Sequence, residues 1–136
     1  QRTAALRQTG ETVVNYLMVA LGGAIGATAR FAVYNAAAFF NVSSQFATFV
    51  INALGALAIG VLYVVINEKS GLQPFGQHLL TIGFLGAFTT YSTYSLDALR
   101  MLEQGQVVPA VTYLVGTMVV CLLATYAGLS LTRLLV

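Results

Sequence analysis

Residues 83–95 form the part of this chain best suited to binding an ion. The run holds two glycines and five serines or threonines, and all of these form helices less readily than alanine or leucine. The hydroxyls can also bond to backbone carbonyls and so compete with helical hydrogen bonds. Where a helix opens, its free carbonyls can bind a small cation and its free N–H groups can bind an anion. The run therefore predicts either an interrupted helix at an ion site or an unbroken packing helix rich in Ser and Thr.

Polar groups in other apolar segments add to this chemistry. Asn52 is the one amide of its segment, and burying an unpaired amide in hydrocarbon costs several kcal/mol. We therefore expect Asn52 to face protein, water or a ligand. A further set of side chains recurs every four residues, which places them on one helix face, either as a polar track or by coincidence: Tyr113, Thr117, Cys121 and Thr125.

Groups for covalent or proton-transfer chemistry are missing from the sequence. Asp97 lies near the end of an apolar segment, three residues before Arg100, where the two side chains can pair. A single cysteine and a single histidine exclude an internal disulfide and a cysteine-rich metal site. The sequence shows neither a nucleophile with its base nor a phosphate-binding loop. We therefore expect no enzyme, but passage of a small ion past hydrogen-bond donors and ring edges.

Composition dictates where these residues must lie. Apolar residues make up 58% of the chain and charged residues 7%, against about 25% charged in soluble domains, so the surrounding solvent must be lipid. Crossing a bilayer takes about 20 mostly apolar residues, and four segments qualify: residues 13–40, 46–66, 79–102 and 107–135. Their short links make consecutive helices antiparallel neighbours. We expect an all-α, multi-pass protein of the cell membrane, one four-helix domain whose third helix is broken at mid-membrane.

Small residues are expected to hold such helices together, because lipid gives helices no hydrophobic reason to associate. Gly22, Gly26 and Arg30 recur every four residues and share a face. The glycines favour close packing against another backbone. Arg30 suits a structural, snorkelling cation or the mouth of an ion path.

Three motifs together resemble the Fluc (CrcB) family of fluoride channels. They are GGAIGA at 22–27 followed by Arg30, FVIN at 49–52 followed by Gly55, and GFLGAFTTYSTYS at 83–95. Their order and spacing match the family, and the similarity extends over essentially the whole chain. The third motif is specific, whereas the glycine motif alone would be weak.

The resemblance implies a fluoride-selective channel for passive export and fluoride resistance in the cell inner membrane. Such channels are antiparallel, dual-topology homodimers with two fluoride pores and a structural Na⁺ ion at the dimer centre. By this resemblance the backbone carbonyls of Gly86 and Thr89 hold the sodium ion. The pore residues implied by the same resemblance are Asn52, Ser92, Thr93, Thr117, Cys121 and Thr125.

Two departures from the family pattern concern the pore. The family has phenylalanine where this chain has Tyr91 and Tyr94, and the positive ring edges of phenylalanine face the anion there. Cys121 stands in place of a hydroxyl and is a weaker donor. Two alternatives follow: a non-conducting homologue closed by the two tyrosines, and a small multidrug-resistance transporter dimer. The transporter class depends on a glutamate in its first span, and residues 13–40 contain no acidic residue.

Overall fold

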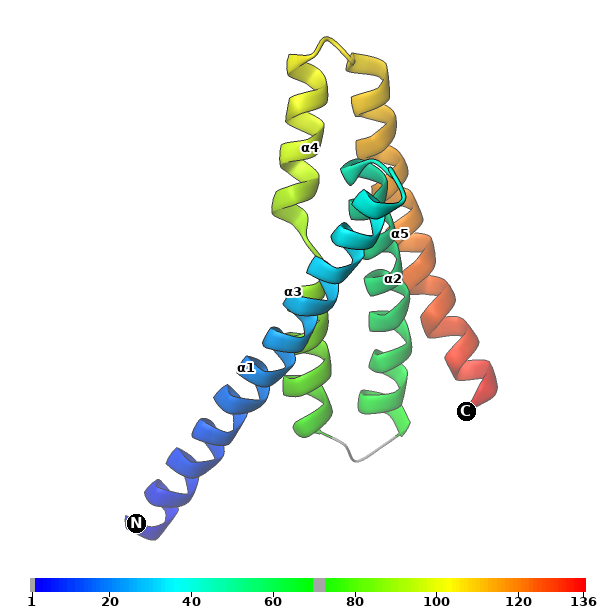
Figure 1. Cartoon of the computed structure of the whole chain (residues 1–136). Coiled ribbons are helices and arrows are strands. Elements are labelled where there is room, and N and C mark those ends of the chain that lie inside the picture. Colours follow the sequence, from blue (N-terminus) through cyan, green and yellow to red (C-terminus); the bar gives the residue numbers. More distant parts are fainter. Residues whose placement is uncertain (1, 70–72) are drawn as a thin grey trace.

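All regular elements of the computed structural model are helices, within the residues it describes, 2–69 and 73–136. In chain order they are α1 (Arg2–Phe39), α2 (Ser44–Tyr63), η1 (Val64–Lys69), η2 (Gln77–Leu85), α3 (Gly86–Phe88), α4 (Tyr91–Glu103) and α5 (Val107–Leu135). The two η elements are π-helical. Figure 1 shows α1 crossing the other helices obliquely, with its N-terminal part extending away from them.

Short polar residues and glycine set the helix ends. Asn41 has a φ of 56° after α1, a left-handed conformation that asparagine adopts more readily than most residues. The Ser43 hydroxyl caps α2 by accepting a hydrogen bond from the Phe46 N–H at 3.3 Å. Gly105, with a φ of 75°, ends the turn after α4, in a left-handed conformation that glycine adopts without strain.

Three helices are long and apolar enough to cross a membrane within the described residues: Gly10–Phe39, Ser44–Glu68 and Val107–Leu135. α5 has the bounds predicted for the last segment. The link expected to begin at Asn67 begins later, because η1 continues the second helix to Lys69. The segment predicted as 79–102 consists of η2, α3 and α4, and none of these alone has the length of a span.

The backbone between α3 and α4 is extended over two residues. Thr89 has φ −73° and ψ 157°, and Thr90 has φ −147° and ψ 111°. We refer to Thr89 and Thr90 as the extended pair. Figure 1 shows this link as the short non-helical stretch between α3 and α4. The extended pair lies within the run 83–95 that the sequence singled out.

Glycines bring α1 against η2. A Cβ atom added at Gly22 would overlap the carbonyl oxygen of Leu79, and one at Gly26 would overlap the carbonyl oxygen of Phe84. The predicted glycine stripe therefore lies directly on backbone, and it fixes the distance between the first helix and the residues just before the extended pair.

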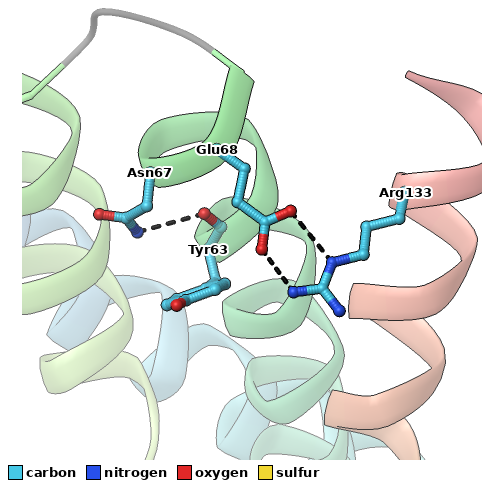
Figure 2. Close-up of polar contacts among 4 residues, drawn as sticks. All are labelled: Tyr63, Asn67, Glu68 and Arg133. Carbon is cyan, nitrogen blue, oxygen red and sulfur yellow. Dashed lines mark hydrogen bonds and ion pairs between the residues drawn. The ribbon is translucent and has the colours of Figure 1, made fainter.

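A second pair of glycines brings α2 against α5. A Cβ at Gly60 would overlap the carbonyl oxygen of Thr125, and a Cβ at Gly128 would overlap that of Leu57. At the end of this helix pair, Arg133 forms a two-pronged ion pair with Glu68 (Figure 2), with its Nε 3.0 Å from Glu68 Oε2. In the same view the Asn67 side chain donates to the Tyr63 carbonyl oxygen at 3.1 Å.

We predict that Gly128→Ala destabilises the protein while Gly116→Ala does not. Both positions lie on α5, but an added Cβ meets the Leu57 carbonyl at position 128 and nothing within 4 Å at position 116. Overpacking of this kind costs about 1–3 kcal/mol, whereas replacing glycine by alanine in an open helix position gains up to about 1 kcal/mol. Thermal unfolding of the purified variants in detergent measures the difference; equal melting temperatures for both would contradict this packing.

Candidate functional site

Asn52 holds the extended pair through two hydrogen bonds to one residue. Its Nδ2 donates to the Thr90 carbonyl oxygen at 3.0 Å, and its Oδ1 accepts from the Thr90 N–H at 2.8 Å. Thr90 is 5% exposed, so neither backbone group has ready access to solvent. The predicted interior amide therefore faces protein, and its partner is the backbone that the interrupted helix leaves open.

The hydrogen bond between the Thr90 N–H and Asn52 deprives the Gly86 carbonyl of its usual helical donor. In a continuous helix this N–H would bond to the Gly86 carbonyl, but here it bonds to Asn52. The Thr89 carbonyl oxygen accepts a hydrogen bond from Arg30 Nη1 at 3.3 Å. The stripe of Gly22, Gly26 and Arg30 thus packs on η2 through its glycines and reaches the extended pair through its arginine.

The donor set near the extended pair suits a hard cation. The carbonyls of Gly86 and Thr89 lie on terminal or non-helical backbone, and carbonyl oxygens of this kind can bind alkali cations in membrane proteins. Gly86 is exposed on the single chain, and a Cβ there would be 3.9 Å from the Thr81 carbonyl oxygen. The described residues include no group of three or more His, Cys, Asp or Glu side chains that could hold a metal.

The first turn of α4 gathers hydroxyls on the other side of the extended pair. The Thr90 hydroxyl accepts from the Thr93 N–H at 3.2 Å and donates to the Thr93 hydroxyl at 3.0 Å. The Ser92 hydroxyl lies 3.4 Å from the Thr90 hydroxyl. A helix N-terminus presents N–H groups and a partial positive charge, so this turn suits an anion. Thr90 was absent from the sequence-based set of site residues.

Two tyrosine rings follow the extended pair on α4. The ring centroids of Tyr91 and Tyr94 are 5.7 Å apart, and Tyr94 lies 5.2 Å from Tyr113. The Tyr94 hydroxyl donates to the Leu114 carbonyl oxygen at 2.6 Å, whereas Tyr91 is 80% exposed. Because the Tyr94 hydroxyl is engaged by α5, what this residue offers to an ion is its ring edge.

Most of the predicted polar residues line one groove of about 440 Å³. A second hollow of about 270 Å³ adjoins it and contains Gly86. Both hollows are lined by the same four residues, Asn52, Thr89, Cys121 and Thr125. The larger groove also holds both tyrosines and Thr117, while Ser92, Thr93, Arg30, Gly22 and Gly26 are not among its lining residues.

Asp97 bonds across helices to a partner that the sequence did not indicate. Spacing allows Asp97 to pair with Arg100, but in the structure Asp97 is 2% exposed and its carboxylate accepts a hydrogen bond from the Thr48 hydroxyl at 3.0 Å. The Tyr34 hydroxyl lies 2.8 Å from that of Thr48. A carboxylate in an apolar interior must be hydrogen-bonded, and Thr48, at 0% exposure, supplies the donor. Nothing in the local spacing marks Thr48, because it and Asp97 lie on different helices and are 49 residues apart in the sequence.

Comparisons with known proteins place the chain beside one family. The model of the family described as "CrcB-like protein, Camphor Resistance (CrcB)" matches residues 17–129. Similar proteins, each named "Fluoride-specific ion channel FluC", come from three bacteria. That of Saccharophagus degradans is 42% identical, over 92% of this chain and 94% of its own length. That of Stutzerimonas stutzeri is 45% identical over 85% and 94%, and that of Hahella chejuensis is 37% identical over 91% and 98%.

We predict that Asn52→Ala loosens the extended pair and destabilises the fold, while Asn35→Ala has little effect. Asn52→Ala leaves a buried N–H and a buried carbonyl of Thr90 without their partners, and each such group costs about 1–3 kcal/mol. Asn35 is exposed on α1. Amide hydrogen exchange at Thr90, together with thermal unfolding, measures the effect. If Thr90 kept its protection in Asn52→Ala, the two hydrogen bonds would have no structural role.

Proposed function

We propose, from the premise that this chain belongs to the CrcB-like protein family, that it is a channel that conducts fluoride passively and specifically. The relatives at 37–45% identity carry the name of such a channel and are matched over almost their whole length. The protein is therefore a multi-pass membrane protein, and its activity is transport. In the cell it would release fluoride across the inner membrane and so give fluoride resistance.

The observation that carries this proposal is the extended pair, held by Asn52 and lying in a groove lined with hydroxyls and ring edges. An anion leaving water needs donors that replace its hydration shell. The first-turn N–H groups of α4, the hydroxyls near Thr90 and the positive edges of the tyrosine rings are donors of that kind. The hydroxyl of Thr117 and the weakly donating thiol of Cys121 extend this set along α5.

Four membrane-crossing segments are proposed for each chain. The first, second and fourth are the helices long enough to cross by themselves. The third is the series η2, α3 and α4, which crosses with the extended pair near its middle. Non-helical backbone is tolerated at membrane depth only where it faces protein or a water-filled cavity, and the pairing with Asn52 and the adjoining groove supply both conditions.

A second, antiparallel copy of the chain is proposed to complete the site. In one chain Gly86 is exposed and Tyr91 is 80% exposed, although both lie close to the extended pair along the chain. A two-fold partner would cover this face and give two equivalent fluoride paths per dimer. The carbonyls of Gly86 and Thr89 from both chains would then hold a sodium ion at the centre. When bound, this ion supplies positive charge that neutralises the carbonyl dipoles where four of them meet.

We predict fluoride efflux from liposomes that contain the purified protein, with chloride efflux close to that of protein-free liposomes. An ion-selective electrode follows the release of each anion. A potassium ionophore is added so that K⁺ leaves with the anion and no opposing membrane potential builds up. Asn52→Asp should reduce fluoride efflux at least about tenfold, because a carboxylate repels an anion beside it. An increase of about 1.4 kcal/mol in the barrier to conduction is enough for a tenfold reduction. A folded dimer that released no fluoride would contradict the proposed function.

We predict that the ring of Tyr94 matters for conduction and that its hydroxyl does not. The hydroxyl is bonded to the Leu114 carbonyl, so Tyr94→Phe should retain most of the fluoride efflux. Tyr94→Ile removes the ring edge and should lower efflux by roughly tenfold or more, that is by at least about 1.4 kcal/mol of barrier. Equal efflux through both variants would show that the ring edge is not part of the path. A large gain in Tyr94→Phe would show that the hydroxyl obstructs it.

A further inference from the structure

Two sulfur-containing side chains of α5 line the larger groove together. Met118 and Cys121 are three residues apart, which makes them neighbours on one helix face, and both are lining residues of the groove. Cys121 is half-buried and carries a free thiol, while Met118 is 57% exposed. Thiolate and thioether are soft ligands that select soft metal ions such as Cu(I) over the hard cations that prefer carbonyl and carboxylate oxygen.

A buried hydroxyl in the same groove also lacks a partner. Thr117 is 5% exposed, and its Oγ1 has no hydrogen-bond partner among the described residues. It lines the groove one helical turn before Cys121 and beside Met118. A buried polar atom left unpaired in the protein indicates a place for a bound group. The unpaired hydroxyl therefore lies on the same helix as the two soft donors, within about one turn of both.

Cys121 is also positioned where the two hollows meet. It is one of the four residues that line both, with Asn52, Thr89 and Thr125. A group bound to its sulfur would lie at the residues that the two hollows share. It would also replace the S–H donor that the passing anion can use, because a metal-bound sulfur has lost its proton.

We propose that Met118 and Cys121 form a binding site for a soft monovalent cation of the Cu⁺ and Ag⁺ class, and that its occupation closes the ion path. The cation displaces the thiol proton of Cys121, which leaves to solvent, and forms one bond to the thiolate sulfur and one to the Met118 thioether. No electron is transferred. The resulting metal thiolate carries no net charge, so it offers fluoride neither a proton donor nor a counter-ion, and it fills the junction of the hollows.

Silver nitrate in chloride-free buffer tests this site, whose effect on flux rests on the proposed fluoride function. Native mass spectrometry counts silver ions bound per chain, and the fluoride electrode records efflux from liposomes with and without silver. One silver ion per chain and loss of most of the fluoride efflux at that stoichiometry are expected. Silver binding at this ratio with undiminished efflux would overturn the closure of the path.

Three variants locate the site, each compared with its own untreated efflux. Met118→Leu should need at least about tenfold more silver for half-maximal binding, since losing even an outer partner of a metal costs about 10–100-fold in affinity. Cys121→Ser should abolish binding. The matched control, Cys121→Ser with Val120→Cys, moves the thiol one position, to a residue outside the groove lining. This double variant should bind silver, and its fluoride efflux with silver should equal its own efflux without silver.

Silver binding tests the soft-metal site, and fluoride efflux tests the proposed channel function, so the two proposals can fail separately. Silver binding that survives in Cys121→Ser, or inhibition that persists there, would overturn the proposed site. If the untreated protein released no fluoride, the proposed function would fail, and the dependence of silver binding on Cys121 and Met118 would still decide whether the soft-metal site exists.

Discussion

An extended pair of residues can lie inside an apolar helix bundle only if its backbone N–H and C=O groups find partners there. In this protein one side chain meets most of that requirement, because the amide of Asn52 donates to the Thr90 carbonyl and accepts from the Thr90 N–H. The same pairing removes the donor that Gly86 would otherwise have. Asn52 therefore stabilises the interruption of the third helical segment.

The rest of the bundle places Asn52 and Arg30 within reach of that interruption. Gly22 and Gly26 let α1 touch the backbone of η2, which carries Arg30 to the Thr89 carbonyl. α2, which carries Asn52, packs closely on α5, so the polar side chains of α5 lie across the groove from the extended pair. The close contacts at glycine thus determine which polar groups meet in the groove.

Local pattern predicts part of this arrangement. The bounds of α5, the packing role of Gly22 and Gly26 and the interior position of Asn52 follow from hydropathy, spacing and the cost of a buried amide. The run 83–95 was marked by composition, yet composition could not select Thr89 and Thr90 within it. Partners across helices were not predictable: Asp97 bonds to Thr48 and not to Arg100, and the Tyr94 hydroxyl bonds to Leu114. Such contacts depend on how helices are rotated against one another, which spacing along one helix does not specify.

If the interrupted helix creates the proposed fluoride site at the start of α4, fluoride must perturb the amides there. A fluoride titration of the isotope-labelled protein measures this effect through the amide ¹⁵N and ¹H chemical shifts of Thr90, Tyr91, Ser92 and Thr93. We expect saturable shifts at these amides with fluoride and none with chloride at the same ionic strength. Unchanged shifts with fluoride, or equal shifts with both anions, would contradict it.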